Sequence, residues 1–195
     1  MGVQILGLPP SLADAVADAC SAAGDGLPDA AVVGLVAPTG TALLDLDRAA
    51  WDEAVASARA AFLDLQAAAR RLVAEGAGGS IAVVVPIHAV RPSAGCGVAA
   101  VVGSFLTTVA QVAAVELGPR GIRVNVVAVG PLEGEAPART AEGVPLGRLT
   151  RPADVGAMCA LLAGPGAAFV NGTVVAVDGG YAVTKAGGGS PFADA

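Results

Sequence analysis

The sequence has few charged and very few aromatic side chains, and both shortages narrow the functions that it can serve. Charged residues make up 14% and aromatic residues 3% of the 195 residues, with only 11 Lys and Arg against 17 Asp and Glu. Nucleic-acid binding needs a clustered basic face, and a chain of net charge -6 with isolated arginine pairs does not provide one. We therefore expect no nucleic-acid partner.

Cysteine is also scarce, with three residues, Cys20, Cys96 and Cys159, far apart in the chain. They form no C-x-x-C pair, so neither a disulfide framework nor a metal site is indicated. Buried, reduced thiols are the expectation, and they suit a cytoplasmic protein. No basic segment precedes an apolar stretch at the start of the sequence, so no signal peptide is predicted.

One long stretch, from Pro92 to Val115, lacks charge altogether. Its length would suffice to cross a bilayer. It nevertheless carries Ser104, Thr107, Thr108 and Gln111, whose spacing of three and four places them along one helical face. We expect a helix buried inside the protein or between subunits, and no membrane partner.

What the chain has in abundance is small apolar residues, which favour a tightly packed core. Hydrophobic residues reach 54%, and the length suits one domain, predicted over residues 1–185, with a flexible tail over 186–195. Apolar runs predict strands at Val3–Gly7, Ala30–Ala37, Ile81–Val85, Arg123–Val129 and Thr173–Val177. Helical periodicity predicts helices at Ser11–Ala23, Arg48–Glu75, Gly97–Leu117 and Pro152–Ala163. This alternation predicts an α/β fold with a Rossmann-like, doubly wound parallel sheet.

Three motifs in the second half of the chain carry a family resemblance. They are GPRGIRVN at Gly118–Asn125, GRLTRPADV at Gly147–Val155, and FVNGT leading to VDGG at Phe169–Gly180. In this order they resemble the short-chain dehydrogenases/reductases, and the likeness covers most of the chain from Ala30 to Tyr181. The resemblance implies hydride transfer between a nicotinamide cofactor and an alcohol or carbonyl compound.

The residues at the family's catalytic positions do not suit that chemistry. The family uses a tyrosine whose phenol, with a pKa of about 10, needs a nearby lysine ammonium to act as a base. The corresponding positions are Val98 for the tyrosine, Val102 for the lysine, Val85 or Pro86 for the serine, and Ser57 for the asparagine. Because valine cannot transfer a proton, we expect this centre to be inactive.

The family's glycine-rich cofactor turn is also altered, over Leu6–Ala13. The backbone of such a turn must approach the pyrophosphate and offer N–H groups at the start of a helix. Of the family's glycines only the first, Gly7, remains. The altered residues of this cofactor-binding loop are Pro9, Pro10, Ser11 and Ala13. The prediction is that no cofactor binds.

A segment expected from the family is missing after the first helix. About five residues separate Gly24 from Ala30, where the family places a strand, a helix and a strand that need roughly 30 residues. The residue that reads the adenosine ribose belongs to that unit. The predicted sheet is therefore shortened and has a different edge.

Five polar residues remain as candidates for chemistry. Tyr181 and Lys185 have the Y-x-x-x-K spacing of the family's catalytic pair but follow the last strand, so we expect a packing residue and a tail charge. His88, the one histidine, is expected to be a loop or interface residue without an adjacent partner. Glu133 and Glu135 are expected to be solvated loop carboxylates.

These observations favour a non-catalytic subunit that supports a catalytically complete homologue in a hetero-oligomer, with self-association as a further option. In the family, the two long helices and the last strand pack against other subunits. The residues expected at such interfaces are Val101, Phe105, Thr108, Val112, Val174 and Val175. Two alternatives stay open: an active NAD(P)-dependent oxidoreductase with atypical residues, and a homo-oligomeric protein that binds a small ligand.

Overall fold

The structure, a computed structural model, describes residues 2–184 except 25–26, 28, 36 and 38. The predicted tail at 186–195 and Lys185 lie outside the described residues. The strands are β1 (Val3–Leu6), β2 (Ala30–Gly34), β3 (Gly79–Pro86), β4 (Ile122–Val129) and β5 (Val174–Val177). The α-helices are α1 (Pro10–Ala22), α2 (Arg48–Glu75), α3 (Gly97–Leu117) and α4 (Pro152–Ala163).

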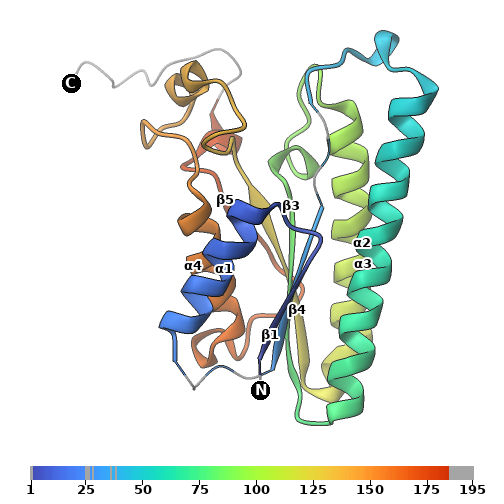
Figure 1. The fold of residues 1–195 in the computed structure, drawn as a ribbon, viewed down its shortest axis with the longest axis vertical. Coiled ribbons are helices and arrows are strands. Elements are labelled where there is room, and N and C mark those ends of the chain that lie inside the picture. Colours follow the sequence, from blue (N-terminus) through green and yellow to red (C-terminus); the bar gives the residue numbers. More distant parts are fainter. Residues whose placement is uncertain (1, 25–26, 28, 36, 38, 185–195) are drawn as a thin grey trace.

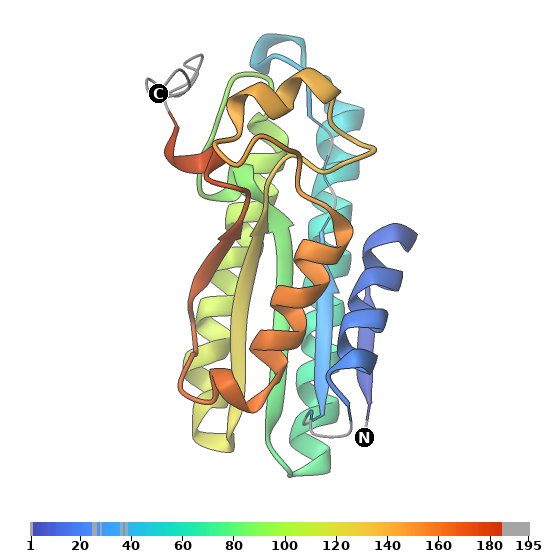
Figure 2. The ribbon, with the colours of Figure 1, turned by 90° about the vertical axis from the view of Figure 1, so that its left-hand side faces the viewer.

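The five strands form one parallel sheet in the order β1-β2-β3-β4-β5. Helices α1 and α4 cover one face of the sheet, and α2 and α3 cover the other (Figures 1 and 2). Because both faces are covered, strands β2 to β4 are almost continuously apolar and buried. The predicted Rossmann-like, doubly wound α/β sheet is confirmed.

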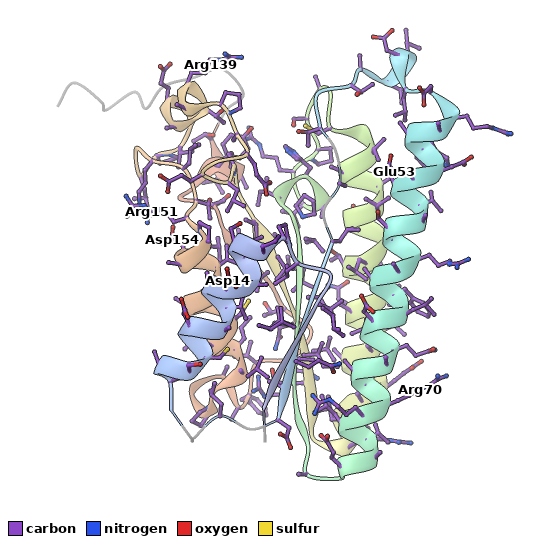
Figure 3. All side chains as sticks on the ribbon, viewed as in Figure 1. Asp14, Glu53, Arg70, Arg139, Arg151 and Asp154 are labelled. Atoms are coloured by element: carbon purple, nitrogen blue, oxygen red, sulfur yellow. The ribbon has the colours of Figure 1, made fainter. Side chains whose placement is uncertain are left out.

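Helix α2 is positioned by its caps and by a row of small residues. The carboxylate of Asp47 accepts a hydrogen bond of 2.8 Å from the backbone N–H of Ala50, and Gly76 ends the helix in a left-handed conformation with φ 71°. The buried residues repeat at helical spacing: Ala54, Ala58, Ala61, Leu65, Ala68 and Leu72. Charged side chains such as Glu53 and Arg70 lie on the outer side of the helix (Figure 3).

Strand β1 lies directly beside β2 and forms one edge of the sheet. The family resemblance expects further strands on the other side of β1. The side chain of Arg71 links the first two strands, because its Nε donates to Gln4 Oε1 of β1 at 3.2 Å and its guanidinium also donates to the Ala30 carbonyl of β2 at 3.0 Å. All four strand-to-strand connections advance in one direction, yet two pass over each face. One pair therefore has the rare crossover hand.

The asparagines of two family-like motifs form a buried network that holds β5 against β4. Asn125 is fully buried, and its amide donates to the Val170 carbonyl at 3.0 Å and accepts from the Thr173 N–H at 3.2 Å. Asn171 accepts from Val124 N–H at 2.9 Å and donates to the carbonyl of Ala114 at 3.0 Å. These motifs are thus explained by packing of the sheet edge.

Helix α3, which carries no charge before Glu116, contacts β3, β4 and α2. The segment Gly97–Arg120 is long and apolar enough to cross a membrane by length and composition, but 44% of its most apolar window is buried inside the protein. A core helix with one exposed side passes the same test. The sequence prediction of a helix packed within the protein is therefore supported.

Candidate functional site

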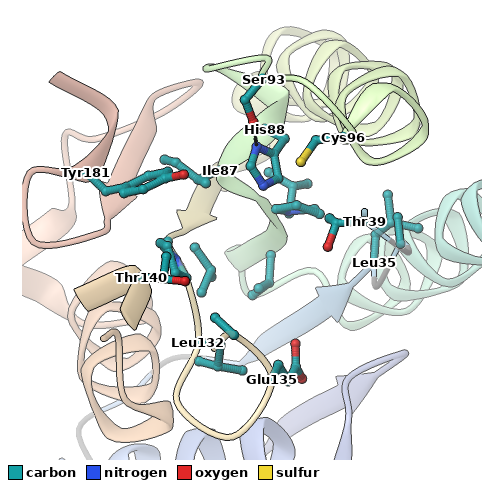
Figure 4. Close-up of a pocket in the computed structure, with 18 of the residues that line it drawn as sticks. Leu35, Thr39, Ile87, His88, Ser93, Cys96, Leu132, Glu135, Thr140 and Tyr181 are labelled. Atoms are coloured by element: carbon teal, nitrogen blue, oxygen red, sulfur yellow. Dashed lines mark hydrogen bonds between the residues drawn. The ribbon is translucent and has the colours of Figure 1, made fainter. Parts of the chain in front are cut away.

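A cleft of about 560 Å³ opens at the carboxyl-terminal edge of the sheet. The loops after β1 and β2 leave toward opposite faces of the sheet, which is the arrangement that creates a ligand crevice in open α/β sheets. Most of the lining is apolar. Seven polar side chains of the described residues line the cleft, and all are labelled in Figure 4: Thr39, His88, Ser93, Cys96, Glu135, Thr140 and Tyr181.

His88 enters the cleft from the short turn that follows β3. Its Nδ1 lies 3.2 Å from Ser93 Oγ and 3.4 Å from the carbonyl oxygen of Arg91. A carbonyl can only accept a hydrogen bond, so these contacts favour a proton on Nδ1 and leave Nε2 as an unprotonated acceptor on the cleft side. Burial lowers the pKa of His88, the bond to the Arg91 carbonyl opposes that shift, and the charge of Arg91 adds to it. The imidazole is therefore neutral at pH 7.

Tyr181 enters the same cleft from the turn after β5, with its hydroxyl directed inward (Figure 4). The guanidinium of Arg91 lies 5.2 Å from the centre of the tyrosine ring and donates to the carbonyls of Tyr181 at 2.6 Å and Thr184 at 2.5 Å. Asp178 completes the turn by accepting from the backbone N–H of Ala182 at 2.7 Å. Tyr181 also packs against the core, as predicted, but its place in the cleft was not foreseen.

The residues at the family's catalytic positions serve the core instead. Val98 and Val102 are buried among the apolar residues between α3 and the sheet. Pro86 ends β3 and lines the cleft without a hydroxyl, and Ser57 lies half-buried on α2. The polar groups of the cleft thus come from loops and not from the positions that carry the catalytic residues in the family.

The turn between β1 and α1 does not fit the pyrophosphate of a nicotinamide dinucleotide in the family's manner. Pro9 caps the helix and Pro10 begins it, so neither offers an N–H. The N–H groups of Leu12 and Ala13 both bond to the Pro9 carbonyl, at 3.0 and 2.9 Å. Within the first helical turn only the Ser11 N–H remains for an anion, where such sites use several.

The space beside this turn is also occupied. A Cβ placed on Gly34 would lie 2.8 Å from Leu8 Cγ, so the leucine side chain fills the gap between the ends of β1 and β2. Gly7 keeps the left-handed conformation, with φ +66°, that the tight turn requires. The turn is therefore retained as a bend in the chain while its phosphate-binding groups are not.

The cysteines and the two loop glutamates are the other residues that the sequence offers for metal binding or chemistry. Among the described residues, no group of three or more His, Cys, Asp and Glu side chains could hold a metal ion. Burial raises the pKa of the Cys159 thiol to about 12 and also raises the pKa of Cys20. Glu133 and Glu135 are exposed as predicted; Glu133 Oε2 lies 3.6 Å from Arg151 Nε, whereas Glu135 lines the mouth of the cleft.

The predicted interface residues lie on two separate surfaces. On α3, Val101, Phe105, Thr108 and Val112 are exposed on the side that faces away from the sheet. Val174 and Val175 are half-exposed on β5, the opposite edge of the sheet from β1.

Comparison with known proteins identifies the family. The model of the family described as enoyl-(acyl carrier protein) reductase matches residues 11–182. The chain therefore belongs to the short-chain dehydrogenases/reductases, a shortened member with an altered catalytic centre.

Curated relatives of the chain include several oxidoreductases. A probable 2,4-dienoyl-CoA reductase of Bacillus subtilis is 34% identical over 131 residues, covering 61% of this chain and 52% of the relative. An L-rhamnose 1-dehydrogenase (NAD(P)(+)) of Azotobacter vinelandii is 35% identical over 133 residues, covering 63% and 52%. The chain thus spans about half the length of the curated relatives it matches.

A solved structure agrees with this assignment. The acetoin dehydrogenase of Salmonella typhimurium superposes with a TM-score of 0.74 at 26% identity, covering 82% of this chain and 67% of that protein.

These relatives overturn the predicted function. The expectation of a non-catalytic subunit, and of a chain that is not an enzyme by itself, is wrong, because the similar proteins are named as reductases and dehydrogenases. Val98 and Val102 exclude one arrangement of catalytic groups. They do not exclude proton transfer by other side chains of the same cleft, and His88 and Tyr181 lie there.

Folding stability is expected to depend on pH through His88. Burial lowers its pKa in the folded state below the ordinary value of 6.5, so below that pH the unfolded chain binds more protons than the folded one. The stabilisation of the folded state by neutral His88 is therefore complete above pH 6.5 and is lost as the pH falls toward the folded-state pKa. Urea denaturation at about pH 7.5 and about pH 5.5 should show a smaller loss of stability in His88→Gln than in the unaltered protein. Equal losses would contradict the assignment.

Proposed function

We propose that the chain is an oxidoreductase that interconverts an alcohol and a carbonyl compound, with atypical residues handling the proton. The observation that carries the proposal is that the His88 ring and the Tyr181 hydroxyl line one apolar cleft at the carboxyl-terminal edge of the sheet. Membership of a family whose named relatives are reductases and dehydrogenases supports the same reaction class.

The two side chains have different roles at the oxygen atom of the substrate. The Tyr181 hydroxyl donates a hydrogen bond to the oxygen, and His88 Nε2 accepts the proton of the alcohol during oxidation and returns it during reduction. Ser93 and the Arg91 carbonyl hold Nδ1, which fixes the orientation of the ring. A neutral imidazole suits the oxidation direction, because its Nε2 is free to accept a proton, and the imidazolium form that results can return the proton during reduction.

A direct assay tests this function. The purified chain is mixed with uncharged aldehydes and ketones and with reduced nicotinamide donors, and the loss of dihydronicotinamide absorbance is followed. We expect slow but saturable turnover that requires both components. Complete absence of turnover with every donor and every carbonyl compound would contradict the proposal.

The predicted partner and location remain proposals. We propose that the chain works in the cytoplasm and associates through the outer side of α3, either with a catalytically complete family member or with a second copy. Val101, Phe105 and Val112 on that side are 52%, 44% and 51% exposed. Adjacent apolar side chains of this kind favour association.

The association surface can be tested by adding charge to it. Replacing both Phe105 and Val112 with Glu is expected to convert an oligomer into a monomer in analytical ultracentrifugation, because the new carboxylates would be buried unpaired at the interface. Leu161→Glu on α4 is the matched control, since that leucine is 55% exposed on the other face of the sheet. Unchanged mass of the double variant, alone and with an added family member, would contradict the proposal.

A further inference from the structure

We infer that the cleft discriminates against phosphate-bearing ligands and recognises its hydride donor through the dihydronicotinamide ring alone. This inference rests on the proposed oxidoreductase function and names the class of co-reactant and substrate: dihydronicotinamides that lack phosphate, and uncharged carbonyl compounds. Three independent features of the described residues support it.

The first feature is the shortage of backbone donors at the start of α1. Tight binding of a pyrophosphate needs several free N–H groups aimed at it. The two prolines, Pro9 and Pro10, remove two of them, and the Pro9 carbonyl takes those of Leu12 and Ala13. A phosphate at this position would lose its hydration and gain at most one strong hydrogen bond from the first turn of α1, which is an unfavourable exchange.

The second feature is steric. The Leu8 side chain fills the space beside Gly34, between the ends of β1 and β2. The sheet also ends at β1, so no strand of the described residues lies beyond this point to form a wall for an adenosine. A dinucleotide would thus leave its adenosine half without contacts, and that half would add little to affinity or rate.

The third feature is charge. No Lys or Arg is among the described residues that line the cleft, whereas the exposed carboxylate of Glu135 stands at its mouth, across the cleft from His88 (Figure 4). The nearby guanidinium of Arg91 is already engaged by two carbonyls and the Tyr181 ring. The rest of the lining is largely apolar. The cleft therefore repels anions and favours a flat, weakly charged ring beside an uncharged substrate.

The reaction balances with such a donor. The donor would supply a hydride to the carbonyl carbon, which forms the new C–H bond, while His88, first protonated on Nε2 by solvent, gives that proton to the oxygen. The donor is oxidised to a pyridinium, the carbonyl compound is reduced to an alcohol, and solvent restores the proton on His88.

The experiment compares three donors on the full chain: NADH, reduced nicotinamide mononucleotide, and N-benzyl-1,4-dihydronicotinamide, which has no phosphate. We expect the benzyl compound to reach a higher kcat/KM than either phosphate-bearing donor, and the mononucleotide to reach a value within about tenfold of the NADH value. A kcat/KM for NADH above that of the benzyl compound, or more than about tenfold above that of the mononucleotide, would overturn the inference while leaving the proposed function intact.

Binding provides a readout that does not depend on turnover. ADP-ribose, which carries the adenosine and pyrophosphate without the nicotinamide, is expected to give no saturable heat in isothermal titration. Saturable binding of ADP-ribose would overturn the inference even if no donor supported turnover, so failure of this inference and failure of the proposed function remain distinguishable.

Two matched variants test the role of charge. Glu135→Gln is expected to raise kcat/KM for the two phosphate-bearing donors by about threefold, since one repulsive charge at an open cleft is removed. The same variant should leave the benzyl donor unchanged. Glu133→Gln is the control, because that carboxylate lies in the same loop beside Arg151 and does not line the cleft. Equal effects of Glu135→Gln on all three donors would contradict a charge-based selection.

Discussion

Replacing Gly156 with alanine is expected to lower the free energy of unfolding by about 3 kcal/mol. An added Cβ would collide with the carbonyl oxygen of Ala15 and lie 2.8 Å from its carbonyl carbon and 3.2 Å from the Val16 nitrogen. These are backbone atoms of α1, which cannot rotate away as a side chain could. Separating α1 from α4 would open the core around Val16 and Cys159, both fully buried. Alanine's higher helix propensity, worth at most about 1 kcal/mol, offsets only part of this loss.

Urea denaturation followed by circular dichroism measures the effect of Gly156→Ala. Gly97→Ala is the control, because Gly97 also lies in a helix and a Cβ there would meet nothing within 4 Å. We expect that control to be neutral or slightly stabilising. A Gly156→Ala variant as stable as Gly97→Ala would mean that α1 and α4 do not pack backbone to backbone.

Replacing His88 with alanine is expected to lower kcat/KM by about 10²- to 10³-fold, the usual loss when a general acid-base group is removed. Its Nε2 faces the cleft, while its Nδ1 is held by Ser93 and the Arg91 carbonyl. Tyr181→Phe should cost about tenfold, since it removes one hydrogen bond to the substrate oxygen while the ring keeps its contact with Arg91.

The pH profile separates a chemical role of His88 from a structural one. In the unaltered protein, alcohol oxidation should rise as the pH passes through the lowered pKa of His88 and then level off, because only the neutral imidazole accepts a proton. His88→Ala should lose this step as well as the rate. Gln111→Ala, at an exposed position of α3, is the matched control and should change neither. Loss of activity in His88→Ala with the pH step retained would assign the step to another group.

Much of the fold could be predicted because local signals and tertiary packing agree. Helix α2 spans Arg48–Glu75 as predicted, since Asp47 caps its start and Gly76 ends it. Strand β3 is longer than predicted, Gly79–Pro86 in place of Ile81–Val85, because parallel pairing with β4 extends as far as Pro86 opposite Val129. Such an extension depends on the neighbouring strand and leaves no mark in the local pattern.

The candidate site could be predicted only in part. The altered turn at Pro9 and Pro10 and the valines at positions 98 and 102 were evident from the family's motifs. The meeting of His88 and Tyr181 was not, because it depends on the Arg91 side chain, which bonds to the Tyr181 carbonyl across 90 positions of sequence. An arginine so close to the only histidine, with Ser93 two residues further on, is the signal that could have pointed to this loop.

Isotope transfer tests the central claim, that this chain moves a hydride to a carbonyl carbon, most directly. The protein is incubated with an uncharged ketone and a dihydronicotinamide donor deuterated at the ring carbon that delivers the hydride, and the alcohol product is analysed by mass spectrometry. We predict an alcohol that carries deuterium on its carbinol carbon with the unaltered protein, and far less of it with His88→Ala. An alcohol without deuterium, or equal amounts of deuterated alcohol with and without the protein, would contradict the account.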